Sequence, residues 1–253
     1  MKKYILIGVA IIVIILLVIV FTRGGKEEAV GYVFGSDATW PPLEFVDESG
    51  EIVGFEIDLI KEMSDRSGIP MTVRNVAWDG IFAGLANGAY DAVASGVTVL
   101  EERKATMDFT TPVLEVTQSI IINNSSSPIA NEAGLSGKTI GVQIGTTGHF
   151  AVEKVSGVTV KAYDEIGLAV EDLLNKNLDA VVADSIIAAD FVLSNENYAN
   201  RLHVSGTVAG DVEQIAMAVK KGNTELLNIL NEQIAALKAD GTIDALKEKW
   251  NVL

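Results

Sequence analysis

Hydrophobic and polar positions along the chain follow two spacings, one typical of strands and one typical of helices. Residues 55–67 carry Ile57, Ile60 and Met63 at helical spacing, and Gly68 stands where a helix commonly ends. Short apolar runs with the length of buried strands lie on either side of this segment, at residues 32–35, 71–76 and 92–94. This alternation of strand and helix signals predicts an α/β fold.

The same alternation continues to the end of the sequence. Asp79 can cap a helix that runs to Asn87. Further strands are expected at residues 138–142, 158–162, 180–183 and 215–219. A long amphipathic helix follows, with apolar residues on one face at Leu226, Leu227, Leu230, Ile234 and Leu237. Asp240 and Gly241 break it, and Thr242 is expected to cap a last short helix.

One segment of the chain echoes another. Residues 85–96 and residues 173–184 each read as the end of a helix, a turn, an Asp, a buried strand and a small or polar residue. The carboxyl end of a strand is where ligands bind in open α/β sheets. The similarity between these two segments therefore suggests two lobes of similar build, each with one strand end at a shared cleft. The alternative is that this pattern is simply a common way for a chain to leave a helix and enter a strand.

The first residues form a targeting or anchoring segment. Lys2 and Lys3 precede an uninterrupted apolar stretch over residues 4–21, which is about long enough to span a bilayer. The two lysines favour an orientation with the remainder of the chain outside the cytoplasm. We expect residues 1–25 to be an uncleaved membrane anchor, and a cleaved signal peptide is the alternative. Either one implies an extracytoplasmic protein.

Composition removes several classes of function. The chain has 253 residues, a net charge of −15 and no cysteine. An acidic chain repels nucleic acid, and the lack of cysteine excludes disulfides, thiolate nucleophiles and a lipoprotein anchor. His149 and His203 are the only histidines, and no nucleophile elbow or phosphate-binding loop is present. We therefore expect no catalytic residues, no metal and no cofactor.

The sequence does contain the groups that a zwitterion needs. Arg103 follows a strand end and can fork onto a carboxylate. A turn over residues 145–148 leads into a helix, whose free N–H groups favour an anion. Asp184 ends a buried strand in the other half of the chain and can accept an ammonium group. Trp40 and Trp78 lie in turn-like contexts where an aromatic face can stay open. Each of these residues alone could have an ordinary structural role, and their combination favours an amino-acid site.

A resemblance to a known family rests on several motifs in the same order. Residues 54–63, Gly-Phe-Glu-Ile-Asp-Leu-Ile-Lys-Glu-Met, resemble the signature of the family 3 solute-binding proteins, the polar amino-acid binders of ABC transporters. Ser64 and Ser67 depart from the small or aliphatic residues usual in the rest of that signature. Further matching segments lie at residues 37–45, 78–80, 95–98, 102–103, 108–110, 141–147, 179–184 and 239–246.

The resemblance implies a two-lobed periplasmic-binding-protein fold of type II, in which two crossover strands join two α/β lobes. We expect the crossovers near residues 118–122 and 208–214. Lobe 1 would comprise residues 26–118 and 213–253, and lobe 2 residues 119–212. The lobes of the family close around a ligand by a hinge motion.

The resemblance also implies roles for individual residues. Trp40 and Trp78 would sandwich the ligand side chain, and Asp37 would face its far end. Arg103 would pair with the α-carboxylate, helped by the N–H groups of Thr98 and Thr147. The α-ammonium group would be held by a set of three residues, Ser95, Gly96 and Asp184. Gln143 is expected in the pocket, where glutamine binders can carry Lys, and Ala183 replaces a His that some of them carry there.

These roles lead to a functional prediction with two alternatives. We expect a monomeric protein that binds a free L-amino acid for an ABC permease, with arginine, lysine or histidine preferred and glutamine next. The first alternative is an enzyme that resembles cyclohexadienyl dehydratase, with Glu44 or Asp37 as the acid. The second is a ligand-sensing module for a separate signalling partner.

Overall fold

The computed structural model describes residues 31–195, 197–208, 210 and 212–252. The chain divides into a unit at Met1–Gly31 and a compact unit at Tyr32–Leu253. The anchor predicted for residues 1–25 lies outside the described residues. Among the described residues, no helix combines the length and the apolar character that a membrane span requires.

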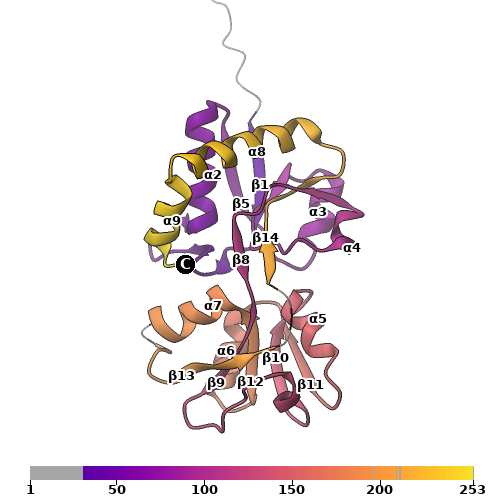
Figure 1. Cartoon of the computed structure of the whole chain (residues 1–253), viewed down its shortest axis with the longest axis vertical. Coiled ribbons are helices and arrows are strands. Elements are labelled where there is room, and N and C mark those ends of the chain that lie inside the picture. The colour runs from indigo at the N-terminus through magenta and orange to yellow at the C-terminus, as the bar shows by residue number, and fades with distance from the viewer. Residues whose placement is uncertain (1–30, 196, 209, 211, 253) are drawn as a thin grey trace, which may run out of the picture. The chain divides into compact units, whose positions relative to one another are not determined.

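Two five-stranded sheets organise the compact unit, one in each lobe (Figure 1). The strands of the first sheet lie in the order β5 (Met71–Asn75), β1 (Tyr32–Ser36), β6 (Ala92–Val93), β15 (Ala218–Lys220) and β7 (Met107–Phe109). Strand β1 is parallel to β5 and β6, whereas β15 is antiparallel to both of its neighbours. Helices α2 (Phe55–Ser67), α3 (Ile81–Asn87), α4 (Glu101–Lys104), α8 (Thr224–Ala239) and α9 (Thr242–Trp250) belong to this lobe.

The second sheet has the order β11 (Thr159–Tyr163), β10 (Thr139–Gln143), β12 (Ala180–Asp184), β9 (Gln118–Asn123) and β13 (Leu202–Thr207). Its lobe contains the α-helices α5 (Thr147–Glu153), α6 (Ile166–Leu174) and α7 (Ser185–Ala189), a 3-10 turn η1 (Glu132–Leu135) and a π-helical turn η2 (Asp190–Ser194). Gly96 and Thr98, which follow β6, line the same cavity as Thr146 and Thr147, which follow β10, and Asp184, the last residue of β12. The carboxyl ends of both sheets therefore meet at one interface.

Two strands join the lobes. Strands β8 (Leu114–Val116) and β14 (Glu213–Ile215) pair antiparallel where the chain passes from one lobe to the other. The first crossover was expected at residues 118–122, and that position is wrong by about one strand. Residues 118–123 form β9, which lies between β12 and β13 in the second sheet. Its three isoleucines are fully buried there, so their apolar character marks the core of a sheet rather than a link.

Helix α2 matches the sequence prediction at both ends. Leu59, Ile60 and Met63 are buried on its inner face, and Gly68 ends it in the left-handed conformation at φ 68°. Two predicted caps are wrong, because α3 follows Gly80 and α9 follows Gly241, with no side-chain cap in either case. The strand predicted at residues 215–219 divides into β14 and β15, which belong to different sheets.

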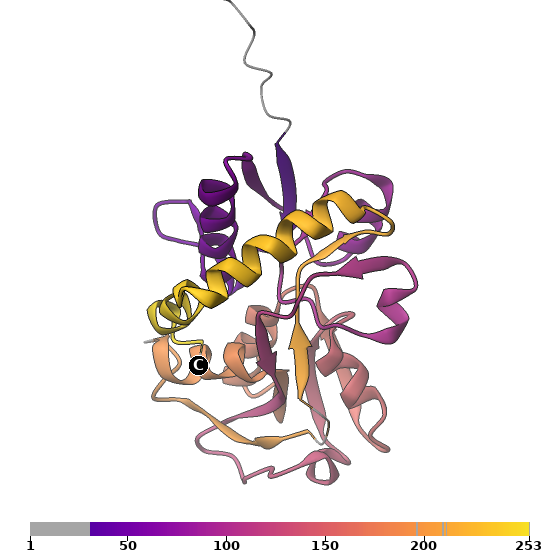
Figure 2. The same cartoon turned by 45° about the horizontal axis from the view of Figure 1, so that its top comes forward.

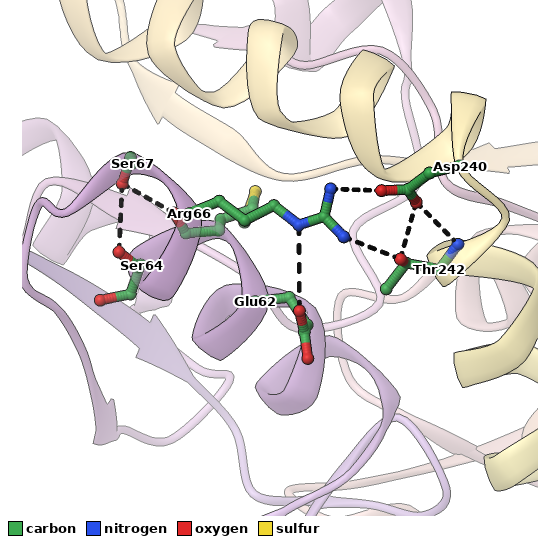
Figure 3. A network of polar contacts seen from close by, with 7 residues as sticks. Glu62, Ser64, Arg66, Ser67, Asp240 and Thr242 are labelled. Atoms are coloured by element: carbon green, nitrogen blue, oxygen red, sulfur yellow. Dashed lines mark hydrogen bonds and ion pairs between the residues drawn. The ribbon is translucent and has the colours of Figure 1, made fainter.

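The C-terminal helices α8 and α9 pack beside α2 (Figures 1 and 2). Arg66, in the last turn of α2, donates to Asp240 and to Thr242 Oγ1, the latter at 2.9 Å (Figure 3). The same guanidinium lies 4.0 Å from Glu62. Thr242, predicted as a cap, instead takes part in these contacts, and its hydroxyl donates to Asp240 Oδ1 at 2.7 Å. The contacts join the first helix of the lobe to its last two.

A small three-stranded sheet leads from β1 into α2. It consists of β2 (Thr39–Trp40), β3 (Glu44–Val46) and β4 (Ile52–Val53). The first N–H groups of α2 donate back to the loop between β2 and β3: Phe55 N to Pro42 O and Glu56 N to Leu43 O, both at 3.0 Å. Helix starts leave such N–H groups without partners inside the helix. The loop that follows Trp40 is therefore fixed to the N-terminus of α2.

Gly54 makes this attachment possible, because it combines φ 139° with close approach to the loop. A Cβ atom at Gly54 would overlap the carbonyl group of Leu43. We expect Gly54→Ala to destabilise the protein by more than about 2 kcal/mol. Gly68→Ala is the matched control, since Gly68 also has positive φ but open space around it, and should cost about 1 kcal/mol. Urea unfolding of the three proteins measures both values, and equal losses would contradict the steric account.

Candidate ligand-binding site

The carboxyl end of β6 forms one wall of the site. Ser95, Gly96 and Thr98 follow the strand, and Gly96 has φ 56°. A Cβ atom at Gly96 would make only ordinary contact with the ring of Trp40, at 3.5 Å, so it is the positive φ that favours glycine here. Ser95 Oγ accepts from the backbone N–H of Asp37 at 2.9 Å. The end of β6 is thereby tied to the end of β1.

Arg103 is the buried cation of the site, with only 8% of its surface exposed. Its guanidinium donates to Thr98 O at 3.0 Å in its own lobe and to Gly145 O at 3.2 Å in the second lobe. The same group lies over the rings of Phe82 and Trp78, 5.0 Å and 5.7 Å from their centroids. Burial lowers the pKa of Arg103, and nearby carboxylates oppose that shift. An arginine remains charged in such surroundings.

Asp184, at the end of β12, is the buried anion that faces Arg103 from the second lobe. It is 2% exposed and accepts from Gln118 Nε2 at 2.7 Å. Burial raises the pKa of Asp184 to about 7; the Gln118 hydrogen bond lowers it, Glu213 raises it further and Arg103 lowers it. A buried carboxylate with so few donors is poised to receive a cation.

Trp40 and Trp78 form the aromatic walls. Their ring centroids lie 6.4 Å apart, and their planes are within 18° of parallel. Trp40 Nε1 donates to Gln143 Oε1, and Gln143 Nε2 donates to Asp37 Oδ2 at 2.9 Å. Burial also raises the pKa of Asp37, against the hydrogen bonds from Thr39 and Gln143. Gln143, at the end of β10, thus connects the second lobe to Trp40 and Asp37 of the first.

Seven of the ten predicted site residues line one narrow cavity of about 10 Å³ between the lobes. The full lining is Trp40, Trp78, Gly96, Thr98, Arg103, Thr146, Thr147 and Asp184. The other three predicted residues, Asp37, Ser95 and Gln143, lie directly behind this lining and are hydrogen-bonded to it or to one another. The structure therefore brings all ten into one neighbourhood.

Sequence reasoning missed Glu213 and Gln118, which stand at the hinge side of the cavity. Glu213 Oε2 accepts from Thr147 Oγ1 at 2.7 Å, Thr98 Oγ1 at 3.2 Å and Gln118 Nε2 at 3.3 Å. It therefore collects donors from both lobes while lying on the crossover strand β14. The predicted crossover at residues 208–214 included Glu213, but no motif in the sequence indicates that its side chain faces the site.

Phe82 and Thr146 were also missed. The ring of Phe82 lies beneath the Arg103 guanidinium. Thr146 is the N-cap of α5, and its hydroxyl accepts from the N–H of His149 at 3.2 Å. His149 is not among the residues that line the cavity. Its Nδ1 accepts from Gly145 N at 3.1 Å. In the part of the chain that the structure describes, no group of three or more His, Cys, Asp or Glu side chains is arranged to hold a metal ion.

Comparisons with curated proteins identify amino-acid transport proteins. The L-cystine-binding protein TcyJ of Escherichia coli is 32% identical over 218 residues, which cover 85% of this chain and 80% of that protein. The ABC transporter arginine-binding protein 1 of Escherichia coli is also 32% identical, over 231 residues that cover 89% and 93% of the two chains.

Solved structures agree with these relatives. An ancestral arginine-binding protein, solved with arginine and with glutamine, is 38% identical at a TM-score of 0.82 and covers 87% of this chain and 97% of its own. The ancestral amino-acid-binding protein AncCDT-1, a precursor of cyclohexadienyl dehydratase, is 31% identical at a TM-score of 0.79, with coverage of 87% and 95%.

The family model for bacterial extracellular solute-binding proteins, family 3, matches residues 32–252, almost the whole of the compact unit. The two-lobed α/β fold and the relatives lead to the same assignment. The chain belongs to family 3 of the bacterial extracellular solute-binding proteins.

Proposed function

We propose that this protein binds a polar, basic L-amino acid outside the cytoplasm and delivers it to an ABC permease. Arginine, lysine or histidine is the preferred ligand, and glutamine is next. The observation that carries the proposal is the pairing of Arg103 and Asp184 on opposite walls of one cavity, beside the stacked rings of Trp40 and Trp78. The two charges match the two ends of an amino-acid zwitterion.

The α-carboxylate of the ligand would pair with the Arg103 guanidinium and take further hydrogen bonds from the N–H groups of Thr98 and Thr147. A planar guanidinium can bind a carboxylate through two parallel hydrogen bonds. The α-ammonium group would go to Asp184, with Ser95 and Gly96 at the end of β6. Because Asp184 is almost fully buried, an ammonium partner there gains strength from the low local dielectric.

The ligand side chain would lie between Trp40 and Trp78. A flat group between two rings needs about 7 Å, given contacts of about 3.5 Å on each side. The centroid separation of 6.4 Å is close to that value, so a small outward movement of one ring admits a guanidinium or amide. Asp37 would face the tip of the side chain. The site has more acidic than basic groups: one buried arginine stands beside three acids, Asp37, Asp184 and Glu213. This balance favours a cationic ligand and disfavours aspartate or glutamate.

Hinge closure would couple binding to transport. We propose lobe 1 at residues 26–118 and 213–253 and lobe 2 at residues 119–212, which move about β8 and β14. The closed form differs from the open form in the surface it offers to a permease, so the ligand acts by shifting the population. Residues 1–25 would anchor the monomeric protein to the membrane.

Binding rather than turnover is favoured on two grounds. AncCDT-1 is itself named an amino-acid-binding protein, so likeness to it supports a binding role. Glu44, one of the two acids considered for a dehydratase, is fully buried and does not line the cavity. A carboxyl group in that position cannot reach a substrate.

A thermal-shift screen against the twenty L-amino acids tests the proposal. Ligand at 100 times its dissociation constant stabilises the folded state by about 2.7 kcal/mol, so basic amino acids should raise the melting temperature by several degrees. Arg103→Ala should abolish the rise, whereas Arg74→Ala, which removes an exposed arginine, should leave it intact. No rise with any amino acid would overturn the amino-acid assignment.

The role of Asp37 predicts a change in selectivity. Asp37→Asn should weaken arginine binding about tenfold while glutamine binding changes less than about threefold, because only the cation loses a charged partner. Titration calorimetry with both ligands measures the difference. The control is Asp79→Asn, an exposed acid in a groove that Asp37 also lines, which alters the same local charge without direct contact. Equal losses for the two ligands would argue against Asp37 as the selecting group.

The ionised form of Asp184, which the proposed function needs for binding, should lower the stability of the ligand-free protein. Its pKa is raised from 3.8 to about 7, so its contribution to stability is greatest below about pH 4 and is lost as the pH rises to about 7. We expect Asp184→Asn to stabilise the ligand-free protein at neutral pH, by at most about 4 kcal/mol, and to flatten this part of the pH profile. The same variant should lose amino-acid binding at least tenfold. Denaturant unfolding between about pH 4 and about pH 8 tests the first point, and an unchanged profile would contradict it.

A further inference from the structure

Two glutamates lie fully buried behind the end of β6, outside the cavity. Glu44 comes from β3 and Glu56 from the first turn of α2, and neither side chain has any exposed surface. One oxygen of each holds the strand end: Ser95 Oγ donates to Glu44 Oε1 at 3.1 Å, and Gly96 N donates to Glu56 Oε2 at 2.7 Å. The predicted ammonium-binding residues therefore rest on this pair of carboxyl groups.

The remaining oxygen of each glutamate has no partner. Glu44 Oε2 and Glu56 Oε1 are both buried, and neither accepts a hydrogen bond from a protein donor. Such orphaned oxygens are rare inside proteins, and an ionised carboxylate in that state is unfavourable. The two side chains lie close enough to hydrogen-bond to each other. A single proton held between the two carboxyl groups would let one of them donate to the other.

The charges around the pair support one negative charge rather than two. Among the described residues, the group that acts on Glu44 besides Glu56 is Asp37, which is also acidic, and Ser95 and Gly96 on β6 do not titrate. In the part of the chain that the structure describes, no cation is among the groups that act on the pair. Two ionised carboxylates in contact would repel each other in a site with little solvent.

The local structure also indicates which residue carries the proton. Glu56 lies at the N-terminus of a helix of 13 residues, where a negative charge is favoured, and it accepts the short hydrogen bond from Gly96. Burial raises the pKa of Glu44 well above its usual range, and the charge of Glu56 raises it further. Burial also raises the pKa of Glu56, but the hydrogen bonds from Gly96 and Glu44 oppose the shift. Glu44 is thus the acid and Glu56 the carboxylate.

We propose that Glu44 and Glu56 share one proton and act as a pair of positioning residues that hold Ser95 and Gly96 in place for ligand binding. The link to the ligand rests on the function proposed above. The path is short: the Ser95 hydroxyl that donates to Glu44 also accepts from Asp37 N, and Gly96 lies against Trp40. Loss of the proton at alkaline pH places a second charge under the strand end and weakens both folding and binding.

Substitutions in the full chain test the shared proton. Glu44→Gln keeps an oxygen for the Ser95 hydroxyl and an N–H donor for Glu56, but it cannot ionise. Glu44→Leu keeps neither group. We expect Glu44→Leu to weaken arginine binding at neutral pH by about tenfold or more, and Glu44→Gln to restore it to within about threefold of the wild type. Binding in the Gln variant as weak as in the Leu variant would overturn the proposal.

Two readouts need no ligand. Asp184, with a pKa of about 7, is also partly protonated at neutral pH, so the infrared comparison is made in the Asp184→Asn protein. Its spectrum at neutral pH should contain the carbonyl band of a buried protonated carboxylic acid, and the added change Glu44→Gln should remove that band. Between about pH 6 and about pH 9 the melting temperature of the wild type should fall by about 3 °C or more relative to Glu44→Gln. The same band and the same pH profile in both proteins would overturn the proposal. If no amino acid binds, the proposed function fails, whereas these two readouts still decide the protonation of the pair.

Discussion

The arrangement of the whole site depends on one buried guanidinium that hydrogen-bonds to both lobes. Arg103 donates to the carbonyl of Thr98 in the first lobe and to the carbonyl of Gly145 in the second. A buried cation needs such partners, because an unpaired charge in low dielectric is strongly unfavourable. The carboxylate of Asp184 balances its charge from the facing strand end. The conformation in which the lobes meet is therefore also the one in which Arg103 has acceptors from both lobes.

One of the two strands that join the lobes also contributes a side chain to the polar contacts of the site. Glu213 lies on a crossover strand, yet its carboxylate binds Thr98 in one lobe and Thr147 in the other. In the proposed hinge motion, this strand would carry an acceptor whose donors come together only when both lobes approach. Gln118, at the start of β9, donates to Glu213 and to Asp184 together. The link between the lobes and the binding cavity are consequently a single polar network.

Local signals in the sequence were enough to predict some features. The bounds of α2 follow from apolar spacing and one terminal glycine. The ten site residues were expected mainly from the resemblance to a known family. What failed depends on contacts between distant segments. The isoleucines of β9 fit either a link or a core strand, and only pairing with β12 and β13 decides between them. Glu213 has no local signal, since its importance comes from which donors the fold brings to it. The caps expected at Asp79 and Thr242 failed because glycines in the left-handed conformation begin those helices.

The order of strands in the first sheet has a consequence for synthesis. Strand β15, at Ala218–Lys220, lies between β6 and β7, although the chain reaches it only after the whole second sheet. A nascent chain therefore exposes an open edge on β6 until residue 218 has emerged, whereas the second sheet is complete by residue 207. Unpaired strand edges favour aggregation. The lobe that begins first along the chain is thus finished last, and in the interval the edge of β6 lacks its partner strand.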